Sequence, residues 1–155
     1  MILHDAKLPP RKGYIEDQDP ITGERYYKKI KQLTGLCRKR IIISSSQNFR
    51  VPKANNQKFI ITLLAGGEKL SSYIEGSNSK IISGSIFLGR YSKVPITIGQ
   101  PGEPTSFGDK LAAYEYDEKS KGLTVDGITY GLGETKDHPA TQGICIIEYD
   151  EPIYE

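Results

Sequence analysis

Near the middle of the chain the sequence reads Phe59-Ile60-Ile61-Thr62-Leu63-Leu64, and two glycines, Gly66 and Gly67, follow almost at once. β-Branched and aromatic residues favour strands, whereas glycine marks places where a strand ends or another backbone comes close. The apolar run therefore predicts a buried strand. Gly66 and Gly67 predict a tight reversal at a point where the backbone must approach a neighbouring segment.

Short β-branched runs of this kind recur beside glycine, proline, asparagine or serine. They are Ile41-Ile42-Ile43, Ile81-Ile82, Val94-Pro95-Ile96-Thr97-Ile98, Leu123-Thr124-Val125 and Ile144-Cys145-Ile146-Ile147-Glu148-Tyr149. None sustains a 3.6-residue apolar period for three turns. The pattern predicts an all-β fold, a short-stranded antiparallel sandwich or barrel with glycine-rich turns. One short helical turn is expected at 106–114, because Phe107, Leu111 and Tyr114 fall at helical spacing.

The first 40 residues differ from the rest. Asp19-Pro20-Ile21-Thr22-Gly23 separates two strand-like segments, 12–17 and 25–30, and has the turn chemistry of a β-hairpin. Pro9-Pro10 favours an extended arm before it. We therefore expect an arm and hairpin at 1–40 that act as a docking segment, a glycine-rich β domain at 41–150, and a short tail at 151–155.

Charge is unevenly spread along the chain. Residues 1–50 hold 11 basic and 5 acidic residues, whereas residues 51–155 hold 10 and 14. The basic excess lies between residues 25 and 40 and is interleaved with tyrosine, which favours a protein-docking surface and leaves nucleic-acid contact as the weaker alternative. The candidate docking residues are Arg25, Tyr26, Tyr27, Lys28, Lys29, Arg38, Lys39 and Arg40.

Tyrosine is the abundant aromatic residue, with 10 copies against 4 phenylalanines and no tryptophan. Its large rigid ring and polar tip suit recognition surfaces. The candidate recognition residues in loops are Tyr73, Tyr91, Tyr114 and Tyr116.

The sequence contains no recognisable catalytic constellation. Cys37 and Cys145 stand far apart, and the two histidines, His4 and His138, belong to no nucleophile or zinc-binding motif. We therefore expect a protein that is not an enzyme and that has no cofactor and no metal site. No apolar run approaches the roughly 18 residues of a membrane-spanning helix, so no membrane insertion is expected.

Five motifs follow one another between residues 48 and 150. They are Asn48-Phe49-Arg50-Val51-Pro52-Lys53, Lys58-Phe59-Ile60-Ile61-Thr62-Leu63-Leu64-Ala65-Gly66-Gly67, Ile82-Ser83-Gly84-Ser85-Ile86-Phe87-Leu88, Val94-Pro95-Ile96-Thr97-Ile98-Gly99-Gln100-Pro101-Gly102 with Thr105-Ser106-Phe107-Gly108, and Gln142-Gly143-Ile144-Cys145-Ile146-Ile147-Glu148-Tyr149. This order resembles the glycine-rich β domain of bacteriophage tail fibres, adhesins and related virion proteins. That family usually carries long polyglycine runs where this chain has only Gly66-Gly67.

The resemblance implies a non-enzymatic structural component of a virion, made in the host cytoplasm, in a tail, collar or fibre. Its partners would be other virion proteins and further copies of itself in a homo-oligomer. Two alternatives stay open. One is an adhesin that binds a host surface receptor or a glycan through the loops, and the other is a nucleic-acid-binding protein that uses the basic segment 25–40.

Overall fold

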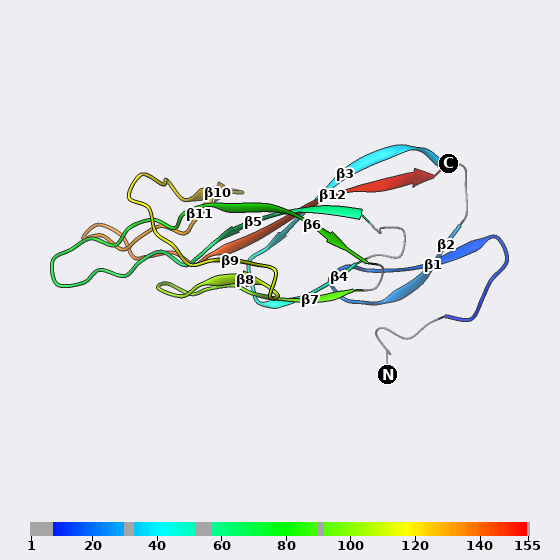
Figure 1. The fold of residues 1–155 in the computed structure, drawn as a ribbon, viewed down its shortest axis with the longest axis horizontal. Helices are drawn as coiled ribbons and strands as arrows, with labels where there is room; N and C mark the ends of the chain where they lie inside the picture. The colour runs from blue at the N-terminus through cyan, green and yellow to red at the C-terminus, as the bar shows by residue number, and fades with distance from the viewer. Residues whose placement is uncertain (1–7, 30–32, 52–56, 90–91, 155) are drawn as a thin grey trace.

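The computed structural model describes residues 8–29, 33–51, 57–89 and 92–154, and within them it contains strands and no helix (Figure 1). The strands are β1 (Tyr14–Gln18), β2 (Arg25–Lys29), β3 (Leu33–Ile43), β4 (Gln47–Arg50), β5 (Gln57–Leu64), β6 (Ile82–Leu88), β7 (Lys93–Thr97), β8 (Thr105–Phe107), β9 (Leu111–Ala113), β10 (Leu123–Val125), β11 (Ile128–Tyr130) and β12 (Ile144–Tyr154). The described residues include no helix that is long and apolar enough to cross a bilayer.

Two four-stranded antiparallel sheets face each other. One has the strand order β3-β12-β5-β6 and the other the order β4-β7-β8-β9. The pairs β1-β2 and β10-β11 form two separate hairpins. The expected all-β sandwich is confirmed, and the sheets do not close into a barrel.

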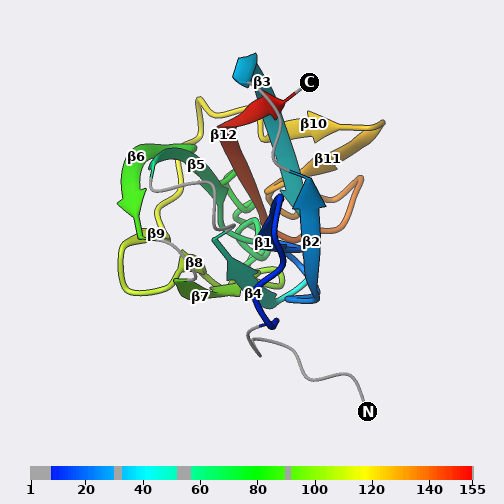
Figure 2. The same cartoon turned by 90° about the vertical axis from the view of Figure 1, so that its right-hand side faces the viewer.

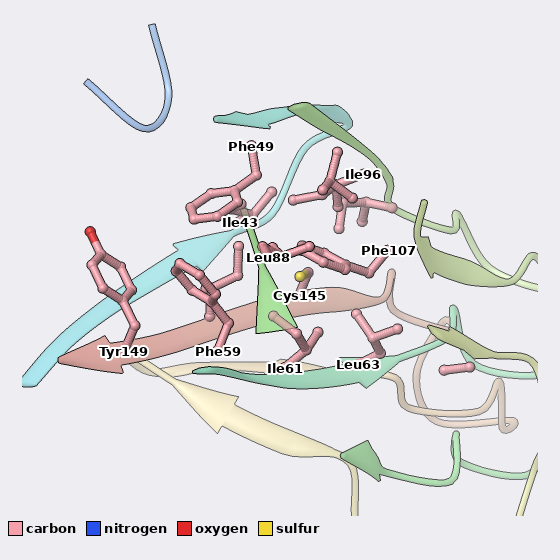
Figure 3. Close-up of a cluster of buried hydrophobic side chains, with 14 of the residues drawn as sticks. Ile43, Phe49, Phe59, Ile61, Leu63, Leu88, Ile96, Phe107, Cys145 and Tyr149 are labelled. Atoms are coloured by element: carbon pink, nitrogen blue, oxygen red, sulfur yellow. The ribbon is translucent and has the colours of Figure 1, made fainter. Parts of the chain in front are cut away.

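Three fully buried phenylalanines join the two sheets (Figure 3). The ring centroid of Phe49 on β4 lies 5.6 Å from that of Phe59 on β5 and 6.2 Å from that of Phe107 on β8. Inclined aromatic pairs of this kind add about 0.5–1.5 kcal/mol each beyond the area they bury. Cys145 of β12 lies in the same layer, where burial raises the pKa of its thiol to about 12.

The apolar run at the start of β12 is continuous because this strand is buried on both faces. Cys145 and Ile147 point into the sandwich. Ile144 and Ile146 point the other way, into a second cluster with Leu64 and with residues of the hairpin β10-β11. The small hairpin therefore covers part of the outer face of the sheet.

The helical turn expected at 106–114 is wrong, because β8 and β9 form a hairpin there. Phe107 and Leu111 are directly opposed across that hairpin. The turn between them includes Gly108 with φ +55° and a hydrogen bond from Lys110 N–H to the Phe107 carbonyl (3.1 Å). A three-residue loop places residues i and i+4 on one face, so it imitates the spacing of a helix.

The N-terminal hairpin is confirmed, with Gln18 paired to Arg25 at its end. The Asp19 carboxylate accepts hydrogen bonds from the N–H groups of Ile21 and Thr22, both at 2.8 Å, which fixes the turn. Figure 2 shows the hairpin in front of the two sheets.

The hairpin is bound to the sandwich through backbone groups. Arg50 N–H donates to the Pro20 carbonyl (2.8 Å), and the Gln18 side-chain amide donates to the Val51 carbonyl (2.9 Å). The boundary expected at residue 40 lies inside β3, and β12 runs through most of the tail expected at 151–155. Residues 1–7 of the expected arm lie outside the described residues.

The tight reversal expected at Gly66 and Gly67 is wrong, although the close backbone approach is confirmed. No turn is found at 65–70. A Cβ atom added to Gly66 would lie 2.0 Å from the Gln100 carbonyl oxygen, and one added to Gly67 would lie 1.7 Å from that of Leu132. Backbone hydrogen bonds join the same segments, including Gly67 N–H to the Thr141 carbonyl (2.9 Å).

The substitution Gly67→Ala tests this packing. Because the neighbouring carbonyl belongs to the backbone and cannot rotate away, we expect the free energy of unfolding to fall by about 3 kcal/mol. The matched control is Gly84→Ala in β6, where the nearest atoms to a new Cβ lie at an ordinary 3.7 Å. There we expect no loss, or a gain of up to about 1 kcal/mol. Denaturant unfolding followed by circular dichroism measures both, and equal effects would contradict the packing argument.

Candidate binding surfaces

The connection between β5 and β6 reaches the end of the molecule opposite the hairpin β1-β2 (Figure 1). Its tip, residues 69–75, carries three exposed apolar side chains, Leu70, Tyr73 and Ile74. Tyr73 is 94% exposed and Ile74 71% exposed. We refer to residues 69–75 as the apolar finger.

The turn of the apolar finger is strained. Ser71 and Ile74 exchange two backbone hydrogen bonds, of 3.0 and 2.7 Å, as in a two-residue hairpin loop. The two central residues, Ser72 and Tyr73, have φ values of +40° and +75°, which is the pattern of a type I′ turn. Asparagine and glycine favour that geometry, whereas other residues there cost of order 1 kcal/mol or more each. The chain thus places an exposed tyrosine where glycine would be more stable.

The base of the apolar finger is held by two carboxylates. Glu134 accepts a hydrogen bond from Leu70 N–H (2.8 Å), and Glu68 accepts one from Ser77 N–H (3.0 Å). Gly76 N–H donates to the Glu134 carbonyl (2.8 Å), and a Cβ on Gly76 would lie only 1.8 Å from the Glu68 carbonyl oxygen. The exposed tip therefore stands on a closely packed base, and a tip held in this way would lose little conformational entropy on binding.

The structure does not gather the candidate recognition tyrosines into one site. Tyr114 is 64% exposed and follows β9. Tyr116 is half-buried, pairs with Ser79 in an isolated bridge, and has a pKa raised by burial and by the nearby Glu68. Tyr91 lies outside the described residues. Leu70 and Ile74 were not expected from the sequence, because an apolar residue gives no sign of being exposed.

Several of the basic candidate docking residues contact carboxylates of the same molecule. Among the described residues, the ion pairs include Arg25–Glu16 (2.8 Å), Lys28–Glu151 (3.7 Å), Arg38–Asp150 (2.9 Å) and Lys39–Glu151 (3.4 Å). The Arg25 side chain is only 6% exposed, so it is not available to bind a partner on the surface. Arg40 is exposed and lies opposite Glu148 in the register of β3 and β12. Because of these ion pairs, fewer basic side chains between residues 25 and 40 are available to bind the phosphates of a nucleic acid than the sequence alone indicates.

The tyrosines of β2 have different surroundings. The Tyr27 hydroxyl donates a hydrogen bond to the Pro9 carbonyl, and the Arg11 guanidinium lies 4.1 Å from the ring centroid of Tyr14 on β1. These contacts pack the start of the described chain against the hairpin. Lys29 is the last residue of β2.

Tyr26 of β2 and Tyr149 of β12 lie near the carboxylates of Asp17 and Glu151, and we refer to these four residues as the polar seam. Tyr149 is buried, whereas Tyr26 is 42% exposed. Desolvation, followed by the carboxylates of Asp17 and Glu151, raises the pKa of Tyr26 to about 12. Desolvation and Glu151 likewise raise the pKa of Tyr149 above its ordinary value. Asp17 is itself buried, and Lys28 of β2 forms an ion pair with Glu151 of β12, so polar groups contribute to the contact between the hairpin and the sandwich.

Neither a family model nor a curated protein nor a solved structure matches this chain. Within the part of the chain that the structure describes, no group of three or more histidine, cysteine, aspartate or glutamate side chains is placed to hold a metal ion.

Because of the two tyrosines in the polar seam, we expect the free energy of unfolding to fall as the pH rises in the alkaline range. A tyrosine with a raised folded-state pKa contributes stability that is complete below pH about 10, its ordinary pKa, and is lost as pH rises toward about 12. We expect the Tyr26→Phe/Tyr149→Phe variant to lose less stability than the natural chain between pH 9 and 11.5. Urea unfolding at a series of pH values measures this. Parallel loss in both proteins would show that the seam is not protonation-dependent.

Proposed function

We propose that this chain is a non-enzymatic structural component of a bacteriophage virion, a tail, collar or fibre protein that binds other virion proteins and further copies of itself. The ordered motifs between residues 48 and 150 and their resemblance to virion β domains support this proposal. The all-β sandwich with glycine-packed connections is also what that resemblance implies.

The observation that carries the proposal is the apolar finger. Its exposed side chains contribute little to the core, and its turn is strained at Ser72 and Tyr73. Backbone strain that folding does not require is typical of functional segments. An exposed aromatic and aliphatic pair on a firm base suits the centre of a protein interface, where such anchors dominate binding energy.

The double substitution Ser72→Asn/Tyr73→Gly tests this role. It replaces the strained turn with the residues that a type I′ turn favours, so we expect the free energy of unfolding to rise by about 1 kcal/mol. We expect incorporation of the protein into particles to fall at least fivefold, because Tyr73 is lost. Quantitative mass spectrometry of purified particles measures incorporation, and Tyr114→Ala, which removes another exposed tyrosine, is the control.

The 94% exposure of Tyr73 also favours a second function, receptor binding by the same finger. The two functions differ in what the variant particles do. Particles that contain normal amounts of the variant but adsorb poorly to host cells would support an adhesin. Normal incorporation together with normal adsorption would contradict both roles, and absence of the natural protein from particles would contradict a virion function altogether.

A further inference from the structure

One end of the β3-β12-β5-β6 sheet continues as a ribbon of only two strands. β5 pairs with β12 from Ile144 to Glu148, whereas β3 pairs with β12 as far as Tyr154. We refer to residues 33–39 of β3 and 149–154 of β12 as the edge ribbon, which lies at the upper right of Figure 1. Residues 36–40 are exposed in succession, so both faces of β3 are open to solvent there.

β3 is also an edge strand, since β12 is its neighbour on one side only. The backbone N–H and C=O groups directed away from β12 offer a template for another strand. An isolated two-stranded ribbon is at best marginally stable in water, and three or more strands with an apolar face make a sheet more stable. The edge ribbon is thus arranged to gain stability when a partner strand is added.

The chain itself shows what kind of strand β3 accepts. On the outer face of the sheet, β3 presents Leu36, Arg38, Arg40 and Ile42 at alternate positions. β12 places Pro152, Asp150, Glu148 and Ile146 opposite them, in the same order. Acidic residues are therefore opposite Arg38 and Arg40, and apolar residues are opposite Leu36 and Ile42.

The arginines retain capacity for a second set of acidic partners. Arg38 contacts Asp150 through Nε at 2.9 Å, yet its side chain is 52% exposed. A guanidinium has five N–H donors in a planar fork, more than one carboxylate can occupy. A strand on the free side of β3 could place its own carboxylates beside Arg38 and Arg40.

A second copy of β3 is a poor occupant of this edge. An antiparallel pairing across a two-fold axis that used the whole strand, Leu33–Ile43, would place Arg38 directly against its own copy and Lys39 against Cys37. Like charges directly opposite each other destabilise a sheet, and charged edge residues are a common defence against self-pairing.

We propose that the outer edge of β3 binds an extended segment of a partner protein whose sequence alternates in the pattern apolar-x-acidic-x-acidic-x-apolar. Main-chain hydrogen bonds supply affinity, and the carboxylates opposite Arg38 and Arg40 supply selectivity. This inference rests on the proposed function, because it names the way in which the chain would hold another virion protein.

Two synthetic peptides test the inference on the full chain. One contains Ile-Thr-Glu-Thr-Glu-Thr-Ile, and the other carries lysine in place of both glutamates. We expect the acidic peptide to bind at least tenfold more tightly and to protect β3 amides from hydrogen exchange. The variant Arg38→Gln/Arg40→Gln should lose this preference. The control Lys119→Gln/Lys121→Gln removes two exposed positive charges from the loop between β9 and β10 and should keep it.

The outcomes separate this inference from the proposed function. Equal binding of the two peptides, no binding of either, or protection outside β3 would overturn the acidic-strand inference, as would tighter binding of a single-stranded oligonucleotide to the same edge. If the natural chain is nevertheless present in particles, the proposed virion function is still supported and only the acidic-strand inference fails. If the chain is absent from particles but binds the acidic peptide selectively, the virion function fails and the strand-binding edge is still supported.

Discussion

The structure depends on backbone segments that pack against each other with no side chain between them. At Gly66, Gly67, Gly76, Gly99, Gly133 and Gly143 a Cβ atom would come within 1.7–2.2 Å of a carbonyl oxygen of another segment. Backbone hydrogen bonds cross the same contacts, for example Gly143 N–H to the Gly99 carbonyl (2.8 Å) and Glu134 N–H to the Glu68 carbonyl (2.8 Å). The connections can therefore satisfy their polar groups without forming regular sheets.

This constraint gives the elongated molecule two unlike ends. At one end, the glycine contacts fix the long connections so closely that a strained, apolar turn can project from them without a core beneath it. At the other end, no such contacts exist among the described residues, and the chain relies on ion pairs and on the polar seam around Tyr26 and Tyr149. The aromatic layer of Phe49, Phe59 and Phe107 lies between the two ends.

The parts that the sequence predicts are those with a local cause. The Asp19–Gly23 turn, the strand at 59–64 and the glycine close approach all follow from residue types within a few positions of each other. The β8-β9 hairpin has the sequence pattern of a helical turn, because the cross-strand pair Phe107 and Leu111 has the spacing i, i+4. The pairing of Arg38 with Asp150 joins residues 112 positions apart, and no local pattern reports it. The exposure of Leu70 and Ile74 cannot be predicted either, because an apolar residue in the sequence gives no sign of being exposed.

The edge ribbon shows how a charge pattern can be structural and selective at the same time. Arg38 and Lys39 of β3 form ion pairs with Asp150 and Glu151 of β12, so part of the positive charge of β3 is compensated within the chain. The same residues nevertheless make self-pairing unfavourable, because the compensating carboxylates lie on the side of β12 and not on the free side. A strand that brings its own carboxylates meets no such penalty. We expect the free edge of β3 to be selective because the carboxylates that neutralise its basic residues all lie on the β12 side. The net charge of the chain does not show this arrangement.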